Sequence, residues 1–186
     1  MLISKNKIQI NEEIIEQFEK DNNLILPESY KKFLLKYNGG DTYETSFKSI
    51  EISNMFGLNT GDIYDLNTII QYELPERLAI EHDLLNICDS ILGDCICIRI
   101  NNPNDDSVWL KYHDRPSKPK KLADSFKEFI QKCKSEKIGH ISTIEERWDR
   151  VTKAGNKDKI TPRMVEGWQK EIDYLNSLIQ EEVIID

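Results

Sequence analysis

The chain has 186 residues, of which 39% are apolar and 31% charged, and this combination is typical of one compact domain with an appendage. No apolar run approaches the roughly 20 residues needed to cross a bilayer, and the opening residues lack the basic and apolar regions of a signal peptide. We therefore expect a soluble, cytoplasmic protein.

The net charge of −8 is concentrated in one part of the chain. Residues 41–110 carry thirteen acidic and three basic side chains, whereas the segments on either side are nearly balanced. A nucleic-acid binder normally presents a basic face to the phosphates, so this pattern argues against direct nucleic-acid binding. It favours a basic protein partner, although acidic side chains often serve only to keep a protein in solution.

Two helices are predicted near the N-terminus. Asn11 followed by two glutamates predicts the start of a helix over 12–21, because the asparagine side chain accepts hydrogen bonds from free backbone amides. The stretch LPESYKKFLLKYNGG, residues 26–40, predicts a second helix with Pro27 at its first position. Its buried stripe consists of Tyr30, Phe33, Leu34 and Tyr37.

The second predicted helix ends in Asn38, Gly39 and Gly40, which tolerate positive φ. An Asn-Gly-Gly sequence also occurs in phosphate-binding loops. Such loops precede a helix, whereas these glycines follow one and meet its negative end. We therefore interpret the sequence as part of the framework.

From residue 43 to 112 the apolar pattern has the two-residue period of β-strands. Short strands are predicted over 47–52, 55–58, 77–82, 84–88, 95–100 and 107–112. A short helix between them carries Ile63, Leu66 and Ile70 on one face. The turn signal at Gly93-Asp94 indicates that the last strands form an antiparallel meander.

A closing helix follows the predicted strands. Its buried stripe consists of Leu122, Phe126, Phe129, Ile130 and Cys133, and it is expected to end at Gly139. Helices that precede and follow a run of strands predict an α+β fold, in which N-terminal helices and a closing helix pack on an antiparallel meander sheet.

The residues after 138 are predicted to form a separate unit, which divides the chain into 1–138 and 139–186. Ser142 and Glu145 fit a capping box, and Thr161-Pro162 starts a further helix. The apolar seam of that helix consists of Val165, Trp168, Ile172, Leu175 and Ile179. The helical hairpin either packs on the domain or meets a partner, and we favour packing because a monomer normally buries such a seam.

Metal, cofactor and catalytic sites are not indicated by the sequence. Cys88, Cys95, Cys97 and Cys133 are expected to be free and reduced, and His82, His113 and His140 lack a zinc-like spacing. His113 and Asp114 are neighbours in an extended segment, so their side chains are expected to point to opposite sides. Glu145-Glu146 and Glu181-Glu182 are interpreted as solvated helix faces. We therefore expect a protein that is not an enzyme.

The sequence resembles the SUKH superfamily of Smi/Knr-type domains over about residues 8–137. The residues that carry the resemblance are Phe18, Glu19, Leu26, Pro27, Tyr30, Phe33, Leu34, Asn38, Gly39, Gly40, Gly93, Asp94, Trp109, Ser125, Phe126 and Phe129. The resemblance implies an α+β fold in which the opening motif is framework. The tail from residue 138 lies outside it.

For most bacterial members, the resemblance implies an immunity protein that binds and blocks a polymorphic toxin, often a nuclease or a deaminase. Fungal members suggest an alternative, a scaffold or regulator of protein interactions. An acidic surface would complement a basic toxin. The candidate partner contacts are Asp62, Asp65, Glu81, Asp83, Asp105 and Asp106, with Trp109 as a candidate aromatic anchor. The alternatives are that the acidic side chains are ordinary surface residues without a partner and that Trp109 packs as part of the framework.

Overall fold

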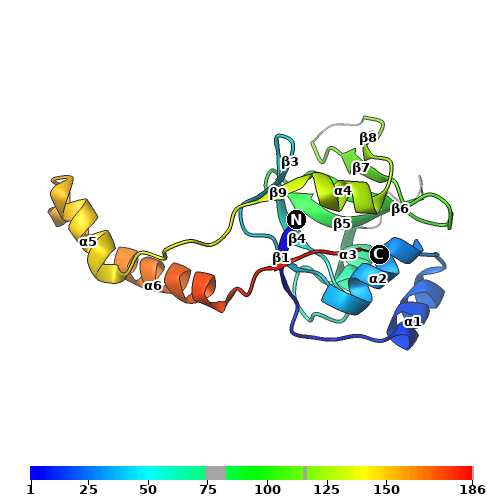
Figure 1. Ribbon diagram of the computed structural model, residues 1–186, viewed down its shortest axis with the longest axis horizontal. Helices are drawn as coiled ribbons and strands as arrows, with labels where there is room; N and C mark the ends of the chain where they lie inside the picture. Colours follow the sequence, from blue (N-terminus) through cyan, green and yellow to red (C-terminus); the bar gives the residue numbers. More distant parts are fainter. Residues whose placement is uncertain (74–82, 115–116, 186) are drawn as a thin grey trace. The chain divides into compact units, whose positions relative to one another are not determined.

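The computed structural model describes residues 1–73, 83–114 and 117–185 (Figure 1). It divides into two compact units, of which the first comprises Met1–Glu136 and Glu181–Asp186 and the second Lys137–Gln180. The strand expected over 77–82 lies outside the described residues.

The first unit is built on a mostly antiparallel sheet whose strand order is β10-β1-β2-β4-β5-β6-β7-β8, with β3 paired to β4 and β9. The bounds of its strands are β1 Leu2–Lys5, β2 Gly40–Asp41, β3 Thr45–Phe47, β4 Ile50–Met55, β5 Leu84–Ser90, β6 Cys95–Arg99, β7 Val108–Lys111, β8 Lys120–Ala123, β9 Cys133–Ser135 and β10 Glu181–Glu182. Strands β5 to β7 form the predicted meander, and each pairs with the next in antiparallel register. Strand β8 extends it and was not predicted, since Leu122 was expected in the closing helix, which begins only at Phe126.

Helices α1 Glu12–Asn22, α2 Glu28–Tyr37, α3 Leu66–Glu73 and α4 Phe126–Lys132 contribute to one core with the strands. We call the strand face that this core covers the inner face. Aromatic rings join α2 to α4, since Tyr30 and Phe126 lie edge to face with centroids 5.3 Å apart. The predicted α+β fold is therefore confirmed. No helix in the described residues is both long and apolar enough to span a bilayer.

The ends of α2 follow from its sequence. Pro27 was predicted at the first helical position, but it is the N-cap, with φ −69° and ψ 147°, and the helix begins at Glu28. An extended Pro27 still suits the start of a helix, because its carbonyl accepts the amides of Tyr30 and Lys31. At the other end Asn38 is left-handed with φ 49°, as predicted.

Several predicted elements differ in the structure. Of the strand expected over 55–58 only Met55 is strand, as the end of β4, and Ile63 lies before α3 and is 72% exposed. The single strand expected over 47–52 is a β3–β4 hairpin, in which Lys48 adopts φ 57° at the turn. The closing helix ends at Lys132 rather than Gly139, because the next residues pair with β3 as strand β9. Sheet pairing overrides the helical pattern at that point.

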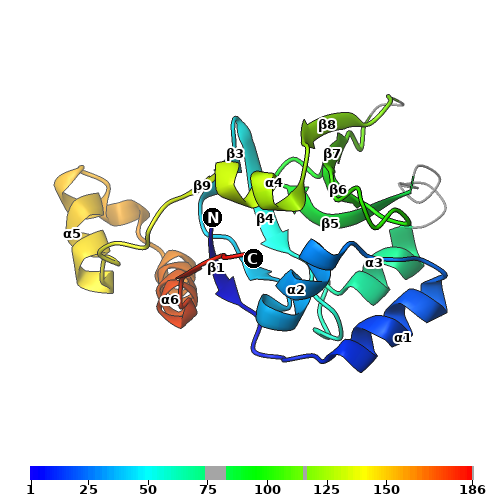
Figure 2. The same cartoon turned by 45° about the vertical axis from the view of Figure 1, so that its right-hand side comes forward.

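The C-terminal residues return to the first unit (Figure 2), where β10 pairs with β1. Val183 and Ile185, which are 6% and 7% exposed, lie in the core of that unit. Glu181 and Glu182 are therefore strand residues, and the expectation of a helical face at this position is wrong.

The second unit contains α5 Ile144–Lys153, the 3₁₀ turn η2 Lys157–Lys159 and α6 Pro162–Ser177. The capping box lies one residue later than predicted and is formed by Thr143 and Glu146. Arg147 joins the helices through a bidentate contact with Glu171 at 2.8 and 3.1 Å. None of residues 137–180, all of which the structure describes, is buried.

Candidate protein-binding surface

The sheet has a second, smaller apolar cluster on the side opposite the core, which we call the outer face. Leu84, Cys95 and Cys97 are buried there, and Trp109 packs against them. Cys97 on β6 and Trp109 on β7 lie directly opposite each other in the antiparallel register. Trp109 points away from the buried side chains of its strand neighbours Val108 and Leu110, in line with the alternation of a regular strand.

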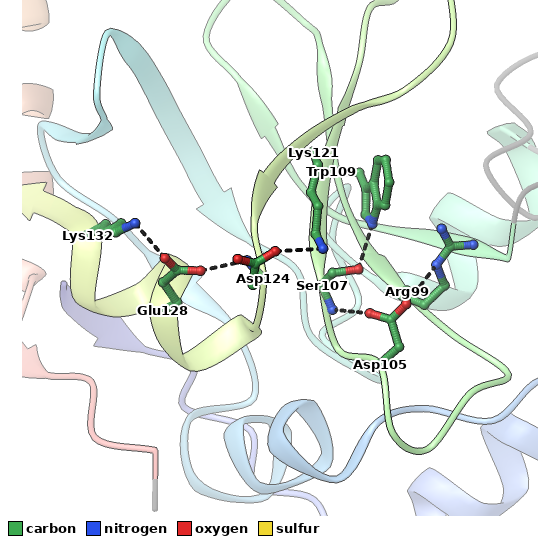
Figure 3. A network of polar contacts seen from close by, with 8 residues as sticks. All are labelled: Arg99, Asp105, Ser107, Trp109, Lys121, Asp124, Glu128 and Lys132. Atoms are coloured by element: carbon green, nitrogen blue, oxygen red, sulfur yellow. Dashed lines mark hydrogen bonds and ion pairs between the residues drawn. The ribbon is translucent and has the colours of Figure 1, made fainter.

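Trp109 is held in place by polar groups on three sides (Figure 3). Its Nε1–H donates to Ser107 Oγ at 2.8 Å. The Arg99 guanidinium and the Lys121 ammonium lie 5.1 and 5.9 Å from the ring centroid, within cation–π range. The ring is half-buried, and these contacts fix its orientation before a partner binds.

Asp105 completes this arrangement at the β6–β7 loop. It accepts the Ser107 amide at 3.0 Å and faces Arg99 Nε at 3.7 Å. Desolvation raises its pKa, but hydrogen bonds from Ser107 and the charges of Arg99 and Lys121 outweigh it, so the pKa lies below the usual value. Asp105 is consequently ionised at neutral pH.

The polar network continues across β8 and α4. Lys121 pairs with Asp124 at 2.7 Å, whose amide donates to Glu128 at 2.6 Å, and Glu128 pairs with Lys132 (Figure 3). The hydrogen bond from Lys132 lowers the pKa of Glu128. Positive and negative groups therefore balance around Trp109, so this part of the surface is mixed in charge rather than acidic.

Three of the acids expected to contact a partner lie around the β6–β7 loop. Asp105 is described above, Asp83 accepts Asn101 Nδ2 at 2.9 Å, and Asp106 accepts Ser29 Oγ at 2.6 Å. Asp83 is exposed, and Asp105 and Asp106 are half-buried. The fold thus gathers them with Trp109 at one end of β6 and β7.

The remaining candidate acids differ from this group. Asp62 is exposed on the loop before α3, where it accepts Thr60 Oγ1 and the Tyr64 amide. Asp65 is only 5% exposed, and its carboxylate accepts the amides of Gly61 and Asn67. A buried carboxylate used within its own loop is poorly placed to meet a partner, so we remove Asp65 from the candidate contacts. Glu81 lies outside the described residues.

The first unit also has a surface hollow of about 480 Å³, which was not predicted from the sequence. Its charged lining consists of the exposed side chains of Glu44, Glu51 and Glu136, and Ile52 and Ile91 supply apolar walls. Glu44 and Glu136 are distant in sequence but adjacent in space, because β3 pairs with β9 and the Glu136 amide donates to Glu44 O at 3.2 Å. No local sequence signal reports such a pairing.

The hollow adjoins an apolar turn. Ile91 and Leu92, on the β5–β6 turn, are 61% and 74% exposed. The turn is firmly held, since the Ile91 amide donates to Glu51 O at 3.1 Å and the Gly93 amide to Ser90 O at 2.9 Å. Exposed aliphatic side chains beside carboxylates resemble the apolar centre and polar rim of a protein interface.

The four cysteines are free, as expected, and all of them are buried. Burial raises the pKa of the Cys133 thiol to about 12 and that of Cys88 well above its usual value. Thiols in this state do not supply a nucleophilic thiolate at neutral pH.

The Asn38-Gly39-Gly40 segment contacts backbone. Asn38 Nδ2 donates to Leu58 O at 2.9 Å, and its Oδ1 accepts the Leu58 amide at 2.8 Å. A Cβ on Gly40 would lie 2.2 Å from Ser4 O, and one on Gly39 2.5 Å from Met55 O. Glycine is required here because the chain crosses itself closely.

Comparison with protein families identifies the domain. The model of the SMI1 / KNR4 family (SUKH-1) matches residues 9–132. The chain belongs to this family. The SUKH-1 match ends at Lys132, the last residue of α4, so the second unit, residues 137–180, lies beyond it. Neither the curated proteins nor the solved structures contain a match to this chain.

Proposed function

We propose that this SUKH-1 protein is an immunity protein, which binds a cognate toxin domain and blocks it without catalysing a reaction. The toxin is a basic protein, such as a nuclease or a deaminase, and the inhibitor acts in the cytoplasm of the cell that makes it. The observation that carries this proposal is the acidic hollow of Glu44, Glu51 and Glu136 beside the exposed Ile91–Leu92 turn.

The charges of the hollow suit a basic partner. A toxin that holds nucleic acid needs cationic side chains, and one of these entering the hollow would meet three carboxylates. The apolar walls accommodate the aliphatic part of a lysine or arginine side chain. The acidic residues of segment 41–110 would also steer the encounter, which at low salt raises association rates to roughly 10⁸–10⁹ M⁻¹s⁻¹.

Trp109 would provide an aromatic contact of a different kind. Its ring is fixed by Ser107, Arg99 and Lys121, so little side-chain entropy is lost when a partner covers it. The neighbouring Asp83, Asp105 and Asp106 would contribute to the rim of such a contact.

Co-expression tests the proposed function directly. The toxin domain encoded next to this gene is expressed from an inducible promoter, with or without this protein. We expect growth arrest by the toxin alone and restored growth when the full chain is present. Persistent arrest, or a neighbouring gene product that is harmless by itself, would contradict the proposal.

A second candidate function is a scaffold or regulatory interaction module acting through residues 137–180. It is favoured by the exposed large side chains of α5 and α6, since Trp148, Met164 and Tyr174 are 39%, 37% and 45% exposed. Helices with such side chains at their surface are common docking elements for protein partners.

A further inference from the structure

Three side chains that commonly bind metal ions converge where the β5–β6 turn meets the end of β7. Asp94 directly precedes β6, whereas His113 and Asp114 follow β7. One potential ligand atom from each of these residues lies within 4.8 Å of the other two. The expectation that His113 and Asp114 point to opposite sides is therefore wrong, because the chain bends after β7 instead of continuing as a strand. The pairing of Cys95 with Lys111 in the β6–β7 hairpin brings Asp94 and His113 together across 19 residues of sequence.

Two of these side chains are fixed by hydrogen bonds. The Asp94 amide donates to Ser90 Oγ at 3.0 Å, and its carbonyl accepts the Ser90 amide at 2.7 Å. Asp94 Oδ1 accepts the His113 amide at 3.2 Å and lies 2.9 Å from His113 Nδ1. Asp94 and His113 are therefore positioned before a ligand arrives, and Asp114 is exposed and free to adjust its side-chain torsions.

The spacing suits a small divalent ion. Ligand atoms about 2.1 Å from a tetrahedral Zn²⁺ lie roughly 3.4 Å from each other. Asp94 Oδ1 and His113 Nδ1 are 2.9 Å apart, the length of a hydrogen bond, so a bound ion would replace the Nδ1 proton and move the two atoms slightly apart. The Asp114 ligand atom lies within 4.8 Å of the other two, and its exposed side chain would have to rotate to shorten that distance.

We propose that Asp94, His113 and Asp114 form a binding site for a divalent transition-metal ion of the Zn²⁺ type. The carboxylates would each supply one oxygen and the imidazole one nitrogen, with water completing the coordination. The imidazole nitrogen favours Zn²⁺ over Mg²⁺ and Ca²⁺, which prefer oxygen ligands throughout. Two carboxylates balance the charge of the ion. This inference is independent of toxin binding.

Isothermal titration with Zn²⁺ alone, using the full-length protein, tests the site. We expect one saturable site in the wild type. Loss of an outer-sphere partner of a metal ligand typically weakens metal binding about 10–100-fold. Removing a ligand itself, in H113A, D94N or D114N, should therefore weaken Zn²⁺ binding at least about tenfold.

H140A is the matched control. His140 Nε2 lies 2.8 Å from Glu146 Oε2, so this variant also removes a histidine paired with a carboxylate but leaves the proposed site intact. We expect its Zn²⁺ affinity to equal that of the wild type. Zn²⁺ should also raise the unfolding midpoint of wild type and H140A but not of H113A. If H113A fails to fold, D114N provides the same test, since the Asp114 side chain is exposed.

Co²⁺ distinguishes the site from cysteine ligation. Oxygen and nitrogen ligands give no sulfur-to-cobalt charge-transfer band, whereas a thiolate does, and all four cysteines are buried. Such a band, the absence of saturable Zn²⁺ binding, or unchanged affinity in H113A and D94N would overturn the proposal.

Discussion

Asn38 shows how one side chain in the family motif holds separate parts of the fold together. It is 1% exposed, and its amide bonds to both backbone groups of Leu58 and to the carbonyl of Ile8. These bonds tie the end of α2 to the segments before α1 and after β4. Because the partners are backbone groups, the side chain acts as a substitute for sheet or helix pairing.

Replacing Asn38 with alanine is expected to destabilise the protein by about 2–4 kcal/mol, because buried backbone groups of Leu58 lose their partner. Asn23→Ala is the matched control, since Asn23 ends α1 in the same left-handed conformation with φ 50° but is exposed. It should lose only about 1 kcal/mol, the cost of a left-handed alanine. Denaturant unfolding measures both values, and equal losses would refute the role assigned to the Asn38 side chain.

At the scale of elements, strand β10 makes residues 181–185 part of the first unit although α5 and α6 precede it. Leu2 is paired with Glu182, and the Leu2 amide also donates to Ser135 Oγ at 2.9 Å. The two ends of the excursion, near residues 136 and 181, therefore flank the same strand, β1. A short linker can replace everything between them.

Deleting residues 137–180 and joining the ends with a short Gly-Ser linker should preserve cooperative unfolding of the first unit. Truncation after Gln180 should instead destabilise it by several kcal/mol, because β10 and the buried Val183 and Ile185 are lost. Thermal unfolding followed by circular dichroism separates the two. Comparable stability of both variants would contradict the importance of β10.

The internal deletion also separates the two candidate functions. Retained protection against the toxin would assign the main contact to the first unit, whereas loss of protection in a well-folded variant would favour the helices α5 and α6.

Elements with strong local signals were predictable from the sequence. The cap at Asn11, the stripe and left-handed end of α2, and the β5–β7 meander follow from spacing and turn chemistry. Strands β1, β2, β8, β9 and β10 were not predicted, because a short strand depends on its partner strand rather than on its own pattern. The hollow and the Asp94–His113 contact were missed for the same reason, since each joins residues that are far apart in sequence.

At the scale of the whole molecule, the net charge of −8 does not show where acidic side chains gather on the surface. The pairing of the strands decides that. The acids named from the sequence proved unequal, since Asp65 serves its own loop and Asp105 faces Arg99. Around Trp109 the charges balance. The hollow instead gathers three glutamates with apolar walls, an arrangement that suits a cationic side chain.

The affinity of the neighbouring toxin domain for two triple variants tests this account most directly. E44Q/E51Q/E136Q neutralises the hollow, and E12Q/E13Q/E16Q removes the same charge from the exposed face of α1. We predict that the first variant binds at least about tenfold more weakly than wild type, a loss of about 1.4 kcal/mol, with a smaller dependence on salt. The second should stay within about threefold of wild type. Equal weakening in both variants, or wild-type affinity in the first, would contradict the proposal that the hollow captures a basic partner.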